Sequence, residues 1–413
     1  MNVGERTDRG ISNRKTLLSP TLVVTMTIFI DITGFGMIIP LLPFYAETFQ
    51  AGGTALGVLV ASFAIMQFVF SPILGRVSDN IGRRPVLLLS ILTSLASFVL
   101  FSAANSFVIL LLSRIVAGMA TETAVAQAYI ADITSGKERA SGMGRVGAAH
   151  GAGFIIGPVI GGSLSVYGFW APGVAAALLT LLNLLFVVVF LPESLVKKVP
   201  TSGTAVVPKS GFVSRLLAAL ARPLVGAVLM IHFIVFLAFS AVPVIVPLLG
   251  IAYFGIGSVE MLYLFVYIGF VQIALQGVII GRLVKRMGEE KLIALGPLLM
   301  MLGLLLMPLF PSTVVFLTSL TLIASGSGIM RTIVPSFISK ATAADEQGGI
   351  LGLASSILSI ATVPGPLIGG SLFEFAGLAA PFFGSAAMLI VAFVISCRVF
   401  QMCWRRDIAT TTT

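Results

Sequence analysis

The chain has 413 residues, of which 57% are hydrophobic and only 10% are charged, and its mean hydropathy is +1.08. Soluble domains carry about a quarter charged residues, so this composition excludes an ordinary soluble globular protein. The net charge of +9 does not indicate nucleic-acid binding, because the basic residues lie in short segments between apolar runs and form no surface stripe.

Residues 1–19 are polar and basic and lack the apolar core of a cleavable signal, so we expect a cytoplasmic N-terminal tail. Twelve apolar runs follow, and each is long enough to cross a bilayer as a helix. These runs are roughly 20–43, 56–74, 86–104, 107–131, 144–166, 171–192, 222–249, 259–281, 292–310, 313–337, 348–373 and 380–403.

The basic residues indicate the orientation of the chain. Of the 25 lysines and arginines, 23 lie at the two termini or in every second loop, and none lies in the alternate loops. The loops that carry the basic residues are 76–84, 132–145, 193–222, 282–291 and 338–347. Loops rich in lysine and arginine stay in the cytoplasm, so both termini are predicted to be cytoplasmic.

The chain repeats itself after six spans. The sequence from Gly157 to Leu164 recurs from Gly365 to Leu372, and Gly75-Arg76-Val77 recurs as Gly281-Arg282-Leu283, at an offset of about 206 to 208 residues. Such a duplication places a substrate site between the two halves, near the bilayer midplane, and lets one half rock on the other.

We therefore expect two pseudo-symmetric six-helix domains, at 20–192 and 222–403. A cytoplasmic linker at 193–221 joins them and carries one amphipathic surface helix over 213–220, and a cytoplasmic tail occupies 404–413. Cys397 and Cys403 lie in the last apolar run and are interpreted as free thiols.

The segment from Gly75 to Pro85 is a short, charged connection of about ten residues between the second and third spans. Its Gly-x-x-x-Asp-x-x-Gly-Arg-Arg spacing resembles the signature between the second and third helices of the major facilitator superfamily. The closest resemblance is to the drug:proton antiporters of the tetracycline-efflux type. That resemblance implies a conformational latch, which contacts helix ends on the cytoplasmic side in the outward-facing state. The latch residues are Gly75, Asp79, Gly82, Arg83 and Arg84. The alternative is a basic hairpin that only sets the topology.

Asp31 lies inside the first span. A carboxylate there must face a cavity or a partner, and burial penalises its charged form, as a proton carrier requires. The alternative is a structural acid held by a fixed hydrogen bond. The run from Asp31 to Pro43 resembles the first helix of the same antiporters.

Arg114 and Gly118 in the fourth span also match that family. An arginine in a membrane stays charged and needs an acid or water, and we expect Asp31 to be its partner. Protonating Asp31 would then free Arg114 and link proton binding to helix packing. A static pairing that only fixes the position of the helix is the alternative.

The fifth span is rich in glycine. Glycines four residues apart let another helix approach closely, and Pro158 bends the helix. The pattern resembles a motif found mainly in antiporters of the superfamily, which implies export, whereas generic small-residue packing is the alternative. The motif residues are Gly153, Gly157, Pro158, Gly161 and Gly162.

Glu122 and Arg331 occupy nearly equivalent places in the fourth and tenth spans, which line the central cavity in the family. The hypothesis is that they pair across the cavity or present opposite charges to a substrate; local pairing is the alternative. Glu122 is the second candidate proton carrier. Gln272 and Gln276 share one helix face, and together with His232 they complete the predicted cavity set.

The match departs from the tetracycline group at two places. Ser97 and Met300 stand where that group carries aspartates. Tetracycline binds as a metal chelate, so tetracycline is not expected to be the substrate. His150 and His232 lie in spans, where a histidine is more often a packing residue than a proton relay.

The predicted fold is an all-α membrane protein with twelve transmembrane helices in two six-helix bundles, the major facilitator fold. The predicted function is proton-coupled export of an amphipathic small molecule by alternating access, in a cell membrane; uptake or facilitated movement of a metabolite or lipid-like solute is the alternative. No enzyme activity, cofactor, metal or nucleic-acid partner is expected. The expected partners are the lipid bilayer, protons and the solute, and the protein is expected to be a monomer.

Overall fold

The computed structural model describes residues 18–134, 136–194, 212–342 and 347–411, and these residues form helices and connecting turns without strands. Within them, twelve helical segments are long and apolar enough to cross a membrane. The predicted fold class is confirmed.

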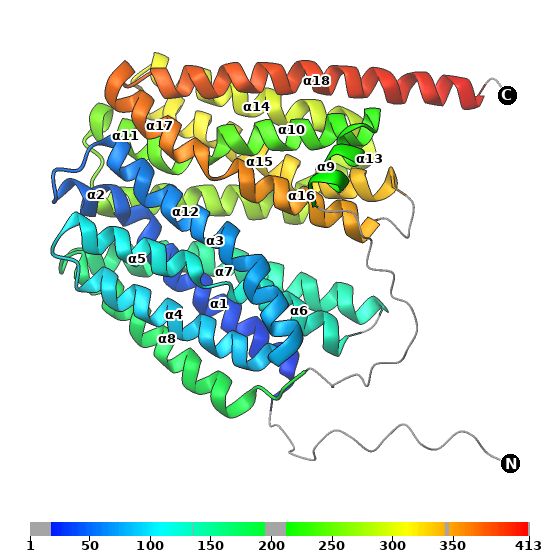
Figure 1. The fold of residues 1–413 in the computed structure, drawn as a ribbon. Coiled ribbons are helices and arrows are strands. Elements are labelled where there is room, and N and C mark those ends of the chain that lie inside the picture. The colour runs from blue at the N-terminus through cyan, green and yellow to red at the C-terminus, as the bar shows by residue number, and fades with distance from the viewer. Residues whose placement is uncertain (1–17, 135, 195–211, 343–346, 412–413) are drawn as a thin grey trace, which may run out of the picture.

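The helices form two bundles that lie one above the other in Figure 1. The first bundle contains α1 (Pro20–Ile38), η1 (Ile39–Leu41), α2 (Leu42–Glu47), α3 (Gly53–Ile81), α4 (Arg83–Ser102), α5 (Phe107–Met119), α6 (Glu122–Ile133), α7 (Gly136–Ser165) and α8 (Trp170–Phe190). The second contains α10 (Pro223–Ser240), α11 (Val242–Phe254), α12 (Ser258–Ala274), the π-helical turn η2 (Leu275–Ile279), α13 (Ile280–Met287), α14 (Glu289–Leu309), α15 (Thr313–Lys340), α16 (Gln347–Ala361), α17 (Pro364–Ala376) and α18 (Ala380–Thr411).

α1 begins and α18 ends at the same end of the molecule, on the right of Figure 1. We call this the terminal end, and the opposite end the far end. The short helix α9 (Phe212–Leu220) lies at the terminal end and packs against the start of α10, where the sequence predicted a surface helix over 213–220. Most of the remaining linker lies outside the described residues.

The connection between the second and third spans is shorter than predicted. α3 continues to Ile81 and α4 begins at Arg83, so only Gly82 separates them, with φ of 115°. The expected ten-residue loop is therefore wrong, because the charged residues from Gly75 to Ile81 extend α3. Gly288, with φ of 81°, makes the same one-residue break between α13 and α14. Glycine is suited to both breaks because other residues rarely adopt such φ values.

The fourth span is interrupted, although the sequence predicted a continuous helix. α5 ends at Met119, and α6 starts at Glu122 after the non-helical pair Ala120 and Thr121. Glu122 is therefore the first residue of a half-helix inside the membrane. The positive end of the helix dipole favours an acidic side chain at that place.

α7 packs directly on the backbone of α1 through the predicted glycine motif. A Cβ atom built on Gly157 would lie 2.5 Å from the carbonyl oxygen of Thr33, and one on Gly161 would overlap that of Met37. A Cβ on Gly153 would lie 2.9 Å from the carbonyl oxygen of Phe29. Only glycine permits this approach, so the motif brings α7 against α1, the helix that carries Asp31.

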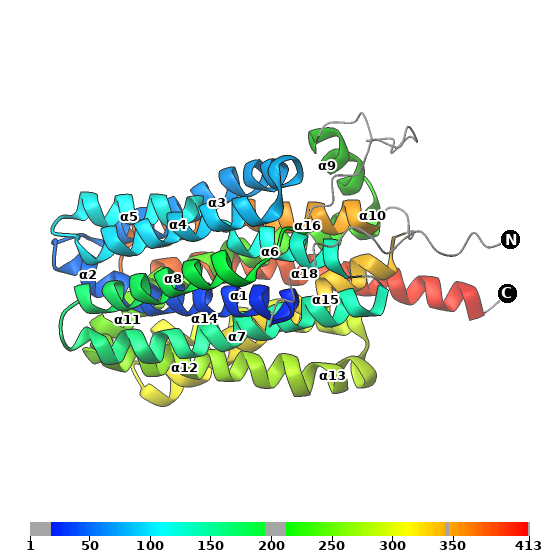
Figure 2. The ribbon, with the colours of Figure 1, turned by 90° about the horizontal axis from the view of Figure 1, so that it is seen from below.

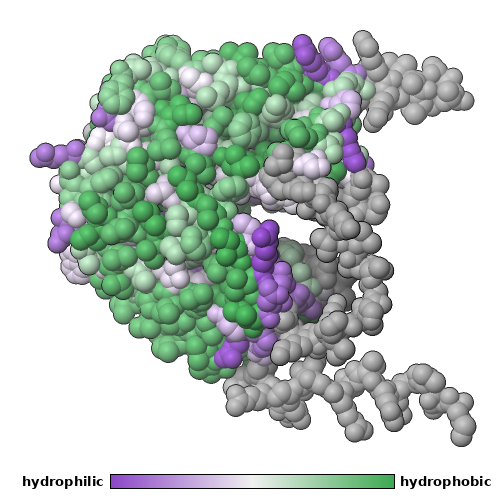
Figure 3. Space-filling model, in the orientation of Figure 1, coloured by the Kyte–Doolittle hydropathy of each residue, from purple (hydrophilic) through white to green (hydrophobic). Residues whose placement is uncertain are grey.

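The outer surface is mainly apolar. Figure 3 shows hydrophobic side chains over the sides of both bundles, with hydrophilic residues gathered near the two ends and along the opening between the bundles. Large apolar side chains such as Val314 and Phe375 are 73% and 80% exposed. An exposed apolar surface of this extent requires a lipid environment.

Candidate functional site

The two halves meet closely at the far end. A Cβ atom built on Gly370 of α17 would overlap the carbonyl oxygen of Gly53, and one on Gly57 would overlap that of Pro366. α3 and α17 therefore approach backbone to backbone across the boundary between the halves.

Two polar contacts also cross this boundary. The backbone N–H of Thr54 donates a 2.8 Å hydrogen bond to the carboxylate of Glu374, which therefore caps the start of α3 from the other half. On the second side of the boundary, the hydroxyls of Ser165 (α7) and Ser258 (α12) lie 3.2 Å apart. The far end is closed by these contacts.

A cavity of about 710 Å³ lies between the halves. Figure 3 shows the molecule hollowed between its two halves at the terminal end. The described walls of the cavity come from α7 on one side and from α10, α11, α12, η2 and α15 on the other. A volume of this size suits a small organic molecule.

The cavity contains part of the predicted substrate set. Gln272, Gln276 and Arg331 line it, and His150, which the sequence suggested was a packing residue, lines it too. Glu122 and His232 are buried and do not belong to its lining. The π-helical turn η2 begins beside Gln276, and it widens the helix where this side chain lines the cavity.

Arg331 lies against aromatic and imidazole side chains. Its guanidinium carbon is 5.3 Å from the centre of the Phe236 ring, and the ring of His232 packs edge-on against the same phenylalanine. Arg331 also interacts electrostatically with His150 and His232. The predicted ion pair between Glu122 and Arg331 does not form in this conformation, because Glu122 is bonded to a different helix.

The two buried acids belong to the first half. The hydroxyl of Ser94 on α4 donates a 2.6 Å hydrogen bond to the carboxylate of Glu122, and Glu122 interacts electrostatically with Asp31 on α1. Spans one, three and four thus bring two carboxyl groups and a hydroxyl together. Ser94 was missed from the sequence, although Ser90, Ser94 and Ser97 mark a polar face on an otherwise apolar span.

The expected pairing of Asp31 with Arg114 is wrong for this conformation. Arg114 is 1% exposed, and none of its three guanidinium nitrogens has a hydrogen-bond partner among the described residues. Its neighbour is the ring of Phe101, whose centre lies 5.8 Å from the guanidinium carbon. Spacing along the sequence does not reveal at which depth two residues on different spans face each other.

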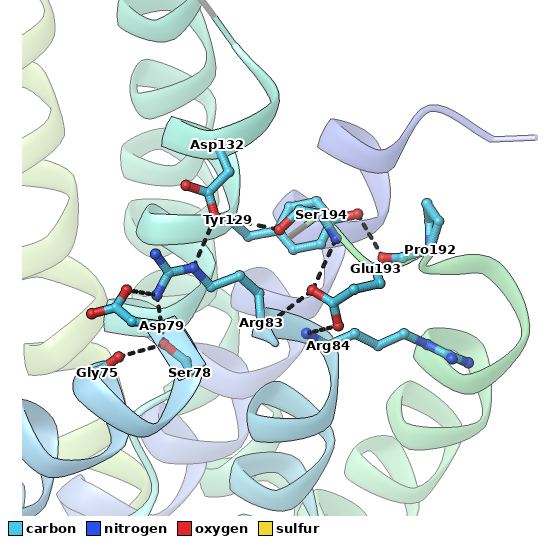
Figure 4. Close-up of polar contacts among 10 residues, drawn as sticks. All are labelled: Gly75, Ser78, Asp79, Arg83, Arg84, Tyr129, Asp132, Pro192, Glu193 and Ser194. Atoms are coloured by element: carbon cyan, nitrogen blue, oxygen red, sulfur yellow. Dashed lines mark hydrogen bonds and ion pairs between the residues drawn. The ribbon is translucent and has the colours of Figure 1, made fainter. Parts of the chain in front are cut away.

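The latch residues form a network inside the first half (Figure 4). Arg83 contacts three partners: the carboxylates of Asp79 at 2.6 Å and Asp132 at 2.8 Å, and the hydroxyl of Ser78 at 2.6 Å. Asp79 remains 59% exposed. The network thus joins the end of α3, the start of α4 and the end of α6.

Glu193, after the end of α8, was missed from the sequence. Its two carboxylate oxygens accept hydrogen bonds from the backbone N–H groups of Arg83 at 2.9 Å and Arg84 at 3.1 Å, at the start of α4 (Figure 4). A carboxylate at a helix N-terminus satisfies free N–H groups and complements the helix dipole. The sequence feature that could have indicated this contact is the position of Glu193 at the end of the sixth span, beside Pro192.

The second half contains the same network with the charges exchanged. Glu289 follows Gly288 as Arg83 follows Gly82, and Lys340 ends span ten as Asp132 ends span four. The carboxylate of Glu289 accepts from Lys340 at 2.9 Å and from Ser336 at 2.7 Å. In each half, an ion pair therefore joins the end of the fourth span to the residue after the glycine break. The cation follows the break in the first half, at Arg83, and the anion follows it in the second, at Glu289.

The sequence and fold of this chain match those of known transporters. The family profile described as Major Facilitator Superfamily matches residues 24–355 and 228–410. The chain belongs to the major facilitator superfamily, and it is a membrane transporter of a small-molecule substrate rather than an enzyme.

Individual relatives agree with this assignment. "Multidrug resistance protein 2" of Bacillus subtilis (strain 168) is 30% identical over 390 residues, which cover 93% of this chain and 95% of that protein. "Tetracycline resistance protein, class C" of Escherichia coli is 33% identical over 352 residues, which cover 84% of this chain and 88% of that protein. The crystal structure of the human organic anion transporter MFSD10 (TETRAN) superposes with a TM-score of 0.68 and 25% identity, covering 91% of this chain and 98% of that one.

The exchanged ion pair gives a test of the paired network. Glu289→Arg alone places two cations together, and it should lower the thermal unfolding midpoint by roughly 2–8 °C, from a loss of about 1–2 kcal/mol. Adding Lys340→Asp recreates the polarity of the first half and should restore most of this loss. Restoration should be incomplete because the start of α14 would lose one of its two acidic residues, Glu289 and Glu290.

Thermal unfolding of the purified protein in detergent measures both variants. The matched control is Lys340→Ala, which removes the pairing without adding a repulsion and should lower the midpoint less than Glu289→Arg. A double variant no more stable than Glu289→Arg alone would show that the two side chains are energetically independent.

Proposed function

We propose that this protein is a proton-coupled secondary transporter that exports an amphipathic small molecule by alternating access. The observation that carries the proposal is that α7 contacts both α1, the helix that carries Asp31, and the cavity. One side of α7 packs on α1, which carries Asp31, and another side lines the cavity through His150 and Gly151. Figure 2 shows α1 and α7 side by side along the length of the molecule.

The two carboxyl groups supply the proton site of this mechanism. Asp31 and Glu122 interact with one another, and like charges close together in an apolar medium are costly, so the pair favours holding at least one proton. Gaining or losing that proton changes the charge on α1, the helix against which α7 packs. A change in this contact moves a wall of the cavity.

The conformation supports alternating access. The cavity opens at the terminal end, while Glu374, Ser165 and Ser258 hold the far end closed. The positive-inside rule assigns the terminal end to the cytoplasm, so this conformation faces inward. The latch network lies within the first half here, and we propose that exposed Asp79 engages the second half only after the cavity closes at this end.

Export, rather than uptake, is supported by the glycine motif of α7 and by the relatives named for multidrug and tetracycline resistance. The membrane potential can act on such a carrier, because one charge crossing 100 mV gains about 2.3 kcal/mol. No resident cofactor is required in this proposal, since the proton gradient is the energy source. The protein acts as a monomer in the cell membrane, with both termini in the cytoplasm.

Proton coupling can be tested in proteoliposomes with a solute found by screening in an efflux-deficient host. Under an imposed pH gradient, the wild-type protein should move this solute uphill. Asp31→Asn and Glu122→Gln should each reduce uphill transport by about 10-fold or more, the usual scale of coupling between two sites. Solute binding should persist, because neither acid lines the cavity.

The matched control is Gln50→Asn, an equally conservative change outside the spans. The double variant Asp31→Asn with Glu122→Gln is then tested with only a proton gradient present. If it still transports the solute uphill at the wild-type rate, the proposed proton site is refuted. If solute transport by the wild-type protein does not depend on the pH gradient, the protein is instead a facilitator.

Alternating access can be tested by locking the far end. The hydroxyls of Ser165 and Ser258 lie 3.2 Å apart across the two halves, so cysteines there are close enough to form a disulfide. In a background lacking Cys397 and Cys403, oxidising Ser165→Cys with Ser258→Cys should stop transport, and reduction should restore it.

Ser163→Cys with Ser258→Cys is the control, because the hydroxyl of Ser163 bonds only to Val159 of its own helix among the described residues, whereas that of Ser165 also reaches Ser258. A quantitatively crosslinked protein that still transports would show that the far end does not open during the cycle.

A further inference from the structure

We propose that the cavity selects amphipathic organic anions, with Arg331 as the group that binds the anionic head. This inference rests on the proposed transport function, because it names the substrate class of the same cavity. It starts from the balance of charge on the cavity wall.

The wall carries a positive charge without a matching acid. Among the described residues that line the cavity, Arg331 is permanently charged, and there is no aspartate or glutamate. The other polar members are His150, Gln272 and Gln276, which are neutral or can gain a positive charge. A cationic solute would find no carboxylate here, whereas an anion would find a guanidinium.

Arg331 is also without an ion-pair partner. Its side chain is exposed to the cavity, and among the described residues no carboxylate lies within salt-bridge distance of it. The titratable groups that interact with it, His150 and His232, are basic rather than acidic. Glu122, the acid predicted to face it, bonds to Ser94 instead. The guanidinium therefore has free donors that suit a carboxylate or sulfonate.

The guanidinium is held in place for this purpose. Phe236 is 1% exposed and its ring faces the guanidinium, and the rings of His232 and Phe239 both pack edge-on against it. Stacking on an aromatic face limits the motion of an arginine and leaves its edge N–H groups available. Phe236 is thus a positioning residue for Arg331.

The remaining wall suits an apolar body. Phe154, Phe239 and Phe265 line the cavity together with aliphatic side chains from α11, α12 and α15. A flat or extended hydrocarbon part can lie against these side chains while the anionic head reaches Arg331. The two glutamines can donate further hydrogen bonds to the head group.

The inference can be tested with three matched naphthalenes that carry a sulfonate, a trimethylammonium or an unsubstituted sulfonamide group. Their binding to the purified full-length protein is measured by isothermal titration calorimetry at neutral pH. The sulfonate should bind at least about 10-fold more tightly than either analogue, as expected for a charge-assisted hydrogen bond. Equal or tighter binding of the trimethylammonium compound, or no binding of the sulfonate, would overturn the inference.

Variants locate the preference at Arg331. Arg331→Gln should weaken sulfonate binding by about 10- to 100-fold and leave the neutral sulfonamide unchanged, and Arg331→Lys should retain part of the preference. Equal weakening of all three ligands by Arg331→Gln would contradict a charge-specific role.

A second variant leaves Arg331 in place. The Gln276 side chain lies beside Gly328, one helical turn from Arg331. Gln276→Glu should therefore weaken sulfonate binding and strengthen trimethylammonium binding, whereas the neutral control Gln276→Met should leave their ratio unchanged. If Gln276→Glu also leaves that ratio unchanged, the anion does not bind at this part of the cavity.

Proton-driven transport is measured separately in proteoliposomes, so the two proposals can fail independently. If the cavity binds cations more tightly than anions while a pH gradient still drives uphill transport, only the anion site is refuted. Sulfonate binding that depends on Arg331, without any response of transport to pH, refutes proton coupling alone.

Discussion

The backbone contact between α1 and α7 is the constraint on which the account depends. Glycines at 153, 157 and 161 let the two helices approach until no side chain fits between them. Close packing of this kind has few alternative arrangements, and in the proposed mechanism a change of charge on α1 would therefore reach α7 as a movement rather than be absorbed by side-chain adjustment. In the proposed mechanism, the cavity wall formed by α7 would move with it.

The distribution of polar contacts agrees with a molecule that rocks. At the terminal end, the network of Arg83 and its counterpart at Glu289 each lie within one half, so neither resists separation of the halves. At the far end, Glu374 and Ser258 contact the other half, and these contacts must break for that end to open. They are single hydrogen bonds, which are individually weak enough to exchange.

The sequence predicted the features that follow from the bilayer and from the repeat. Apolar length defined the spans, and the glycine spacing in span five predicted a close helix contact. It could not predict contacts that depend on relative depth, and so Arg114 was wrongly assigned to Asp31, and the partner of Glu122 was Ser94 rather than Arg331. The charged residues after Gly75 were assigned to a loop because polarity was taken as the end of a helix, although α3 continues into the headgroup region.

The most direct test measures proton-driven transport and ligand binding together in Gly157→Ala. A Cβ at this position would lie 2.5 Å from the carbonyl oxygen of Thr33, whereas Gly352, the control for the same substitution, has nothing within 4 Å. The account predicts that Gly157→Ala binds ligand in the cavity but loses uphill transport, while Gly352→Ala retains both. Uphill transport by a folded Gly157→Ala protein at the wild-type rate would contradict the account.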